Sequence, residues 1–254
     1  MPGAAPAVES SSLRNDLTRR DFTINAMAIC IDNDNFGQLI DYFGGQRDIL
    51  DKKIRVLHSL SFVDDPTRAF RAVRFAARYG FKLGSHTERL LKHAEQLGLF
   101  GKIRGGKLFV ELKYILCENK YLVAFEELRK YGMLKYIAPK LSINDSRKNQ
   151  FIYLDSMYKR FKDKLSADTN IAYVRYALLR FDYPAAEDKQ VVTVLNAEQT
   201  LAERLIQIHG KGKYTAKKIK GMKTPHPSEI YAVLKKLTDE ELLLAAVAMG
   251  EKSN

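Results

Sequence analysis

Cysteine and long hydrophobic runs are both scarce in this sequence. Its two cysteines, Cys30 and Cys117, do not have the spacing of metal ligands, and one pair cannot make a disulfide framework. Such sparse use of cysteine is typical of a reducing cytoplasm. No segment approaches the roughly 20 consecutive apolar residues of a membrane helix, and the N-terminus lacks a basic region followed by an apolar one. We therefore expect a cytoplasmic protein with no secretory signal and no membrane partner.

The composition is that of a globular protein with an excess of positive charge. Of 254 residues, 46% are hydrophobic and 28% are charged, which allows a sizeable core. The formal net charge of +12 favours a polyanionic partner, with nucleic acid ahead of a membrane surface. A mildly basic protein without such a partner is the alternative, and charge alone does not exclude it.

The pattern of elements changes near residue 57. Before it, apolar residues at 26–31 and 37–41 flank a polar turn and predict a β-hairpin, and residues 54–57 predict another short extended segment. After it, only helices are predicted. Because an isolated hairpin is marginally stable, the sequence predicts a mainly α protein whose small β-hairpin is the end of an α/β domain.

Start and stop signals place the predicted helices. Pro66 lies in the first turn of a helix that Gly80 ends, and residues 85–88 resemble a capping box for the next helix. Further helices are predicted over residues 171–181, over residues 197–209, and from Ser228 and Thr238. One row of large residues at helical spacing predicts core packing rather than a cofactor box: Tyr153, Met157, Phe161 and Leu165.

A dense polar motif precedes the predicted hairpin, Arg19-Arg20-Asp21-Phe22-Thr23-Ile24-Asn25-Ala26-Met27-Ala28. Guanidinium groups bind phosphate oxygens through paired hydrogen bonds. A neighbouring Asp21 or Asn25 can accept hydrogen bonds from ribose hydroxyls. The motif therefore predicts a nucleotide-binding corner, and the alternative is a surface cluster of ion pairs. Downstream, paired Gly44 and Gly45 permit a hinge or a tight turn.

A third segment, residues 62–80, carries a carboxylate and a guanidinium at the start of a predicted helix. Asp65 and Arg68 are three residues apart and therefore share a helix face. An acceptor beside a donor matches the Watson–Crick edge of cytosine or adenine, where an amino group adjoins an unprotonated ring nitrogen. Guanine and uracil present the inverse pattern, so the pair is expected to accept C and A and reject G and U. The alternative is that Asp64 or Asp65 only caps the helix.

Arginines continue along that helix. Arg71, Arg74 and Arg78 form a basic stripe, while the opposite side is apolar. This stripe predicts a face that contacts phosphates beside the nucleotide pocket. A solvated helix face is the alternative, and it is the usual explanation for charged stripes.

In this order and spacing, the three segments resemble the class II tRNA nucleotidyltransferases and their poly(A) polymerase relatives. The run from Arg19 to Ala28 is similar to the family's nucleotide-binding signature without a mismatch, and Gly44-Gly45 resembles its hinge. Residues 64–68, Asp-Asp-Pro-Thr-Arg, resemble the segment that reads the base. The resemblance is strong from about residue 8 to about residue 115 and fainter beyond. It favours base reading over capping alone.

The resemblance implies a nucleotide-binding set, which consists of Arg19, Arg20, Asp21, Asn25, Asp65, Arg68, Arg71 and Arg74. Within it, Arg20 and Asp21 fall where the family contacts the phosphate and ribose of the incoming nucleotide. Asp65 and Arg68 fall where its protein template pairs with C or A, and the other arginines help to hold nucleotide and template. Asp64 replaces a more common Glu. ATP, and also CTP, are the implied substrates, with the 3′ end of an RNA, tRNA first, as the partner.

The family's catalytic head also holds two Mg²⁺ ions on an Asp-x-Asp pair that follows a Gly-rich strand. Too few residues precede Arg19 for that module. Asp32-Asn33-Asp34 has the right letters but lies after the nucleotide signature, inside a predicted turn, so no metal site and no catalytic residue is predicted here. The 254 residues are thus expected to be inactive alone. A non-catalytic RNA-binding module, and one half of a split enzyme completed by a separate chain with the head, are the alternatives.

The remaining basic residues predict RNA contacts. These are Arg78, Lys107, Lys211, Lys213, Lys217, Lys218 and Lys220. Lys107 stands where relatives often have Arg, and the lysines after residue 209 lie among glycines, so a mobile surface loop is an equal alternative there. The predicted domains are a remnant of the head's palm at 1–57, a neck with the base-reading helix at 58–110, and a helical RNA-binding body at 111–254.

Overall fold

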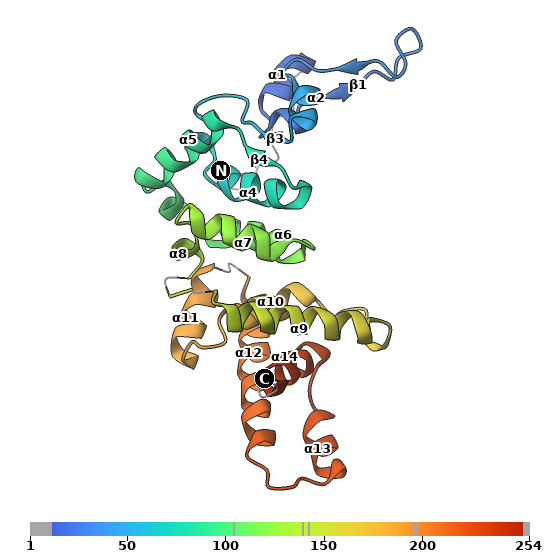
Figure 1. Ribbon diagram of the computed structural model, residues 1–254, viewed down its shortest axis with the longest axis vertical. Helices are drawn as coiled ribbons and strands as arrows, with labels where there is room; N and C mark the ends of the chain where they lie inside the picture. Colours follow the sequence, from blue (N-terminus) through green and yellow to red (C-terminus); the bar gives the residue numbers. More distant parts are fainter. Residues whose placement is uncertain (1–11, 104, 139, 142, 196–197, 251–254) are drawn as a thin grey trace. The chain divides into compact units, whose positions relative to one another are not determined.

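The computed structural model describes residues 12–103, 105–138, 140–141, 143–195 and 198–250 (Figure 1). These residues form two compact units, which divide between Leu99 and Phe100. The predicted division into a palm remnant at 1–57, a neck at 58–110 and a body at 111–254 stays a prediction. The mainly α fold is confirmed, because the described residues contain only two sheets of two strands each. None of the described helices is both long and apolar enough to cross a membrane.

The first unit has short helices around two small sheets. Its elements are α1 (Leu13–Thr18), η1 (Thr23–Asn25), β1 (Ala28–Ile29), β2 (Leu39–Ile40), α2 (Gly45–Leu50), β3 (Lys53–Ile54), α3 (Ser61–Asp64), α4 (Thr67–Tyr79), β4 (Lys82–Leu83) and α5 (Ser85–Gln96). The predicted hairpin is confirmed but short, with Ala28 opposite Ile40 in the antiparallel pair β1–β2. The core lies under α4, where Phe22, Phe70 and Val73 are fully buried.

The prediction that only helices follow residue 57 is wrong at one place. Gly80 ends α4 in the left-handed region, with φ of 69°, and the chain then extends as β4. Lys82 and Leu83 pair in parallel with Lys53 and Ile54 of β3. The capping box predicted for α5 is also wrong, since Gly84 occupies the cap position and no side chain bonds there. The helix itself begins at Ser85 as predicted.

The paired glycines form a tight corner at the start of α2. Gly44 is left-handed, with φ of 76°. At Gly45 a Cβ would lie 2.5 Å from the backbone oxygen of Thr23, so only glycine lets α2 pack this closely on the η1 turn. This close packing places α2 directly behind the polar motif that precedes the hairpin.

The second unit is entirely helical among the described residues. Its elements are α6 (Gly105–Cys117), α7 (Tyr121–Lys130), α8 (Leu134–Ile137), α9 (Asp145–Phe161), η3 (Lys162–Lys164), α10 (Ile171–Leu179), α11 (Ala185–Leu195), α12 (Gln199–Lys220), α13 (Pro227–Leu234) and α14 (Asp239–Met249), while η2 (Leu99–Lys102) spans the division. Helix α10 is central, and its residues from Ala172 to Leu179 are all buried. Thr238 opens α14 with a full capping box, as the sequence indicated for that start.

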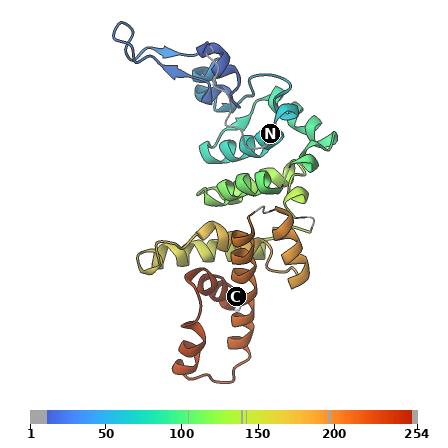
Figure 2. The same cartoon turned by 180° about the vertical axis from the view of Figure 1, so that it is seen from behind.

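The tract of lysines and glycines after His209 belongs to a helix, so the loop alternative is wrong. Helix α12 continues through it to Lys220, and α13 returns beside it (Figures 1 and 2). At Gly212 a Cβ would come within 2.9 Å of Leu244, because α12 packs closely against α14 here. Tertiary packing thus overrides the low helix propensity of glycine.

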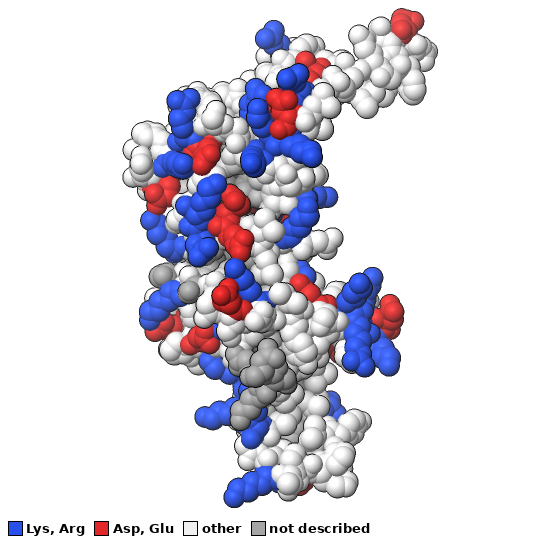
Figure 3. Space-filling view, in the orientation of Figure 1, with Lys and Arg blue, Asp and Glu red and all other residues white. Residues whose placement is uncertain are grey.

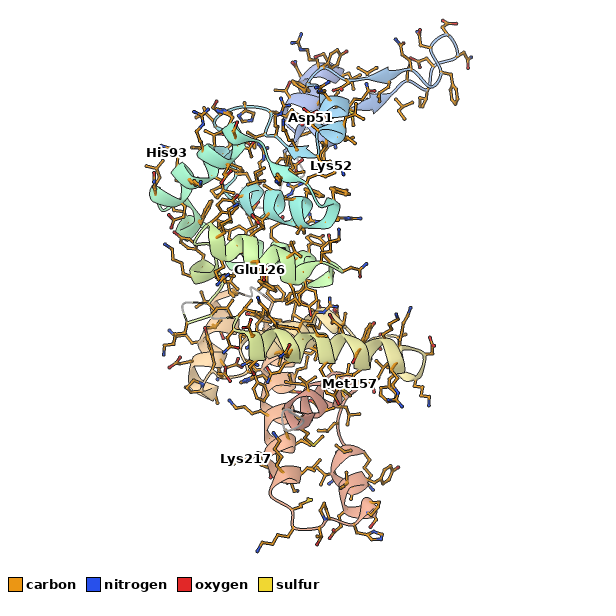
Figure 4. All side chains as sticks on the ribbon, viewed as in Figure 1. Asp51, Lys52, His93, Glu126, Met157 and Lys217 are labelled. Carbon is orange, nitrogen blue, oxygen red and sulfur yellow. The ribbon has the colours of Figure 1, made fainter. Side chains whose placement is uncertain are left out.

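The prediction that Tyr153 and its row form core packing is also wrong for Tyr153. Its side chain is exposed, and Met157, labelled on α9 in Figure 4, is only half-buried. The buried stripe of α9 runs instead through Phe151 and Leu154. Both rows of residues have helical spacing, but the face of α9 that packs in the core is the one with Phe151 and Leu154, next to the predicted face.

A buried charged cluster joins α10, α11 and α12. The Asp188 carboxylate forms an ion pair with Arg180 and lies 3.1 Å from Nδ1 of His209. The Arg180 guanidinium also stacks 4.1 Å above the Tyr176 ring, and burial raises the pKa of the Tyr176 phenol to about 12. Asp188, Arg180 and His209 are each at most 3% exposed. Such groups are stable in a core only when they neutralise one another.

Candidate nucleotide-binding site

The polar motif folds into a turn between α1 and η1 that fixes one carboxylate. Asp21 is only 5% exposed. Its Oδ1 accepts hydrogen bonds from the Phe22 amide at 2.9 Å and from the Asn25 side chain at 3.0 Å. Its Oδ2 lies 2.7 Å from the Arg71 guanidinium on α4. The motif and the arginine stripe of α4 are therefore joined by an ion pair whose carboxylate is buried and whose guanidinium is partly exposed.

The two arginines before Asp21 share a second carboxylate. Asp16 accepts from Arg19 at 2.7 Å and from Arg20 at 3.2 Å, one oxygen to each, within one turn of α1. The hydrogen bonds from Arg20 and Arg19 hold the pKa of Asp16 below its usual value. Both arginine side chains are more than half exposed. Their remaining N–H groups can therefore reach an anion in the adjacent solvent.

A further network supports the η1 turn from behind. Thr23 donates its hydroxyl to Asp48 of α2 at 2.6 Å, and the other oxygen of the fully buried Asp48 lies 2.6 Å from Arg55. The Thr23 amide donates to the Arg55 carbonyl at 3.0 Å. Asp48 thus holds the backbone that presents Asp21 and Asn25 to the same side.

The start of α4 carries the predicted base-reading pair. Asp65 Oδ1 accepts from the amide of Thr67 at 3.1 Å and from its hydroxyl at 2.6 Å. Arg68 donates to the hydroxyl of Ser61 and to the backbone carbonyl of Arg19, both at 3.0 Å. The capping alternative is therefore correct for one oxygen of Asp65. It leaves the other oxygen, Oδ2, without a donor among the described residues.

These groups line one cavity of the first unit. It measures about 480 Å³ and is lined by Arg19, Arg20, Asp21, Asn25, Asp65, Arg68 and Arg71. Seven of the eight residues predicted to bind a nucleotide thus surround a single space, although they come from two segments, residues 19–25 and 65–71, that are well separated in sequence. Guanidinium groups suited to phosphates lie next to a carboxylate–guanidinium pair suited to a base edge. Their role in binding stays a prediction.

The remaining arginines of the stripe lie outside this cavity. Arg74 packs with its guanidinium 4.5 Å from the centre of the Phe75 ring, and Arg78 lies 5.5 Å above the Tyr79 ring near the end of α4. In Figure 3, basic side chains on the visible face are interspersed with acidic ones. The stripe is thus divided between a cavity residue, Arg71, and two residues that stack on aromatic rings.

The lysines predicted to bind RNA differ in their freedom. Lys213 donates to the carbonyls of Phe181 and Tyr183, and Lys220 donates to that of Ala248. Lys211 pairs with Glu241 at 3.1 Å. Lys217, labelled on α12 in Figure 4, and Lys218 are exposed. So is Lys107, in the first turn of α6.

No metal site is found among the described residues. They contain no group of three or more His, Cys, Asp and Glu side chains that could hold an ion. The residues of the cavity also do not fit a metal, because its carboxylates are bound by Arg71, Asn25 and Thr67 and its other charged groups are cationic.

Motif reasoning missed the groups that hold the cavity residues in place. Asp16 could have been found, since its spacing from Arg19 and Arg20 places all three on one face of a helix. Ser61 and Thr67 gave no signal, because the partner of a buried hydroxyl depends on side-chain rotamers that sequence does not specify.

Two family descriptions match the chain. Residues 2–55 match the poly A polymerase head domain, and residues 80–144 match the probable RNA and SrmB-binding site of polymerase A. A solved tRNA nucleotidyltransferase, in complex with a primer tRNA and an incoming ATP analogue, is 36% identical, with a TM-score of 0.76 over 94% of this chain and 70% of that one. The chain belongs to the class II tRNA nucleotidyltransferase/poly(A) polymerase family.

Curated members of the family agree with this assignment. The A-adding tRNA nucleotidyltransferase of Geobacter sulfurreducens is 38% identical over 253 residues, and that of Aquifex aeolicus is 54% identical over 136 residues. These matches cover 95% and 54% of this chain but 28% and 16% of the two relatives. The chain thus spans less than a third of the length of each of these two curated relatives.

Proposed function

We propose that this chain is part of an enzyme that adds nucleotides to the 3′ end of RNA, with tRNA as the leading substrate. ATP, and also CTP, are its proposed nucleotides. The observation that carries the proposal is the single cavity in which Asp65 and Arg68 lie beside Arg19, Arg20 and Asp21. The names of the relatives, A-adding and multifunctional CCA proteins, support tRNA over other RNAs.

Each part of the cavity matches one part of a nucleotide. Arg19 and Arg20 supply exposed guanidinium groups for the phosphates. Asn25 and the buried Asp21 line the same cavity and would face the ribose. The free oxygen of Asp65 would accept from the amino group of C or A, while Arg68 would donate to the ring nitrogen beside it.

In the proposed reaction, the terminal 3′ oxygen of the RNA attacks the α-phosphorus of the nucleotide. A new P–O bond forms, the bond from the α-phosphorus to the oxygen that bridges it to the β-phosphate breaks, and pyrophosphate leaves with that oxygen. The hydroxyl proton passes to solvent water. In the family, Mg²⁺ ions supply charge neutralisation at this centre. The residues of this chain would bind the nucleotide, select its base and hold it in line, which lowers the entropic part of the barrier.

The 254 residues by themselves are expected to bind nucleotides weakly and not to transfer them. They contain no Asp-x-Asp after a Gly-rich strand, and their described part has no metal-ligand cluster. The test incubates the purified chain with tRNA lacking its 3′ end, Mg²⁺ and labelled ATP or CTP, with a complete family member as positive control. Extension by the chain at a rate near that of the control would refute this expectation.

A non-catalytic RNA-binding module is the second candidate. The exposed Lys217 and Lys218 on α12, together with the net charge of +12, favour it. The same purified chain separates the two candidates. A module of this kind binds tRNA but shows no preference among the four nucleotides, whereas a nucleotidyltransferase part prefers ATP and CTP. In the split-enzyme form of the first proposal, adding a separate polypeptide with the paired aspartates restores extension.

A further inference from the structure

The free oxygen of Asp65 is oriented by its neighbour Thr67. The amide and the hydroxyl of Thr67 both donate to Oδ1, at 3.1 and 2.6 Å, and so occupy the acceptor positions of that oxygen. The Thr67 side chain is buried, with an exposure of 7%. Because Thr67 is buried in α4, these two bonds restrain rotation of the carboxylate, and Oδ2 is left as the acceptor that Asp65 can offer to a ligand in the cavity that it lines.

Ser61 fixes the other member of the pair. Its fully buried hydroxyl accepts from Arg68 Nη1 at 3.0 Å, and the Arg19 carbonyl accepts from Nη2 at the same distance. A guanidinium carries five N–H donors. Two are therefore used to set its plane, and three stay available to a ligand.

Neighbouring Asp64 has no such support. Its side chain is exposed, and the imidazole Nδ1 of His58 lies 3.9 Å from its Oδ2. The two adjacent aspartates of this segment thus differ in a physical way. Only the carboxylate of Asp65 is held by a buried hydroxyl on the wall of the cavity.

We propose that Thr67 and Ser61 are positioning residues that determine base selectivity, Thr67 through Asp65 and Ser61 through Arg68. This inference rests on the proposed function, since it requires that the pair reads the base edge. Base reading depends on one acceptor and one donor held side by side. A carboxylate that rotates, or a guanidinium that tilts, offers an equally good contact to the wrong base through water.

Helix capping alone does not account for the hydroxyl. The backbone amide of Thr67 already donates a capping bond to Asp65 Oδ1, and on the Thr67 side that bond does not involve the side chain. Replacing Thr67 with valine keeps the amide, the side-chain shape and the burial, and it removes only the hydroxyl bond. Replacing it with serine keeps the hydroxyl. The pair of variants therefore separates positioning from capping.

The test measures the affinities of the chain for CTP, UTP, ATP and GTP by ligand-observed NMR, which detects weak binding. Wild type, T67V, T67S and S61A are compared, with T87V as a matched control. The Thr87 hydroxyl is also buried and accepts from the Val56 amide at 3.1 Å, but it does not line the cavity. We expect the preference for CTP over UTP to fall about tenfold in T67V and in S61A, the worth of one oriented hydrogen bond. T67S and T87V should keep it.

The outcomes distinguish the two proposals. If T67V and S61A keep the wild-type preference while D65A abolishes it, positioning by the hydroxyls is wrong and base reading stands. If wild type shows no preference, or D65A leaves it unchanged, the proposed function fails and this inference fails with it. Thermal unfolding of each variant, followed alongside, shows that a lost preference does not come from unfolding.

Discussion

Replacing Asp65 with asparagine is expected to remove most of the discrimination between CTP and UTP. An asparagine amide presents an oxygen or an NH₂ group according to how it rotates. Because the amide and the hydroxyl of Thr67 both donate to Oδ1, the oxygen of the asparagine amide stays there and its NH₂ group takes the place of Oδ2. That NH₂ group donates to the O4 carbonyl of uracil and cannot accept from the amino group of cytosine. Since a well-formed contact of this kind discriminates by about 1–3 kcal/mol, the ratio of affinities should fall by roughly 10-fold or more. Total nucleotide affinity should change less, because the phosphate-binding arginines remain.

The matched control for this variant is Asp64→Asn. It removes the same charge one residue away, from an exposed side chain that faces His58 rather than the cavity. D64N should keep the preference for CTP. Equal loss of selectivity in D64N and D65N would show that net charge, rather than the orientation of one carboxylate, governs the effect, and base reading by Asp65 would then be excluded.

The second unit should be strongly destabilised when Asp188 is replaced by alanine. Arg180 would remain in the core with its counter-charge removed, and His209 would lose the carboxylate beside its Nδ1; both side chains belong to residues that are at most 3% exposed. Breaking a buried ion pair on one side costs about 3–5 kcal/mol. Hydrogen exchange of the α10, α11 and α12 amides reports this loss segment by segment, so it does not require the two units to unfold together.

Glu126→Ala provides the comparison for that experiment. Glu126 of α7, labelled in Figure 4, lies 2.8 Å from Lys148, but the two side chains are 52% and 32% exposed. An exposed pair contributes less than about 1 kcal/mol. D188A should therefore lose several times more protection than E126A. Losses of similar size would mean that the buried cluster contributes no more than a surface pair.

Signals that act within one element were the reliable guides to the fold. Gly80 takes a positive φ just after α4, and Thr238 makes a capping box at the start of α14, because each signal depends on residues within one turn. Strand β4 could not be foreseen in this way. Its two residues pair with β3, which lies 29 positions earlier, and such a short segment has no period of its own.

Packing between helices explains why the sequence pattern gave wrong predictions for α12 and α9. The glycines of α12 suggested a loop, yet Gly212 lies within the helix. Glycine is needed there because Leu244 of α14 occupies the space that a side chain would fill. On α9, the row through Tyr153 had helical spacing, but the buried face passes through Phe151 and Leu154. Period identifies a helix, and only the partner surface decides which face is buried.

For the candidate site, the sequence named all seven residues that line the cavity, and their contact with a nucleotide stays a prediction. Spacing placed Asp65 and Arg68 together, and the polar motif placed Arg20 beside Asp21. It could not show that Arg71 pairs with Asp21 or that Arg68 donates to the Arg19 carbonyl, since these contacts join segments about 50 residues apart. Those contacts are what make one cavity from two motifs.

A crystal structure of the chain with bound CTP tests the central claim most directly. The account predicts that the cytosine amino nitrogen lies about 3 Å from Asp65 Oδ2, that Arg68 donates to N3, and that the triphosphate lies against Arg19 and Arg20. A cytosine bound elsewhere, or one whose Watson–Crick edge faces away from Asp65 and Arg68, would contradict it.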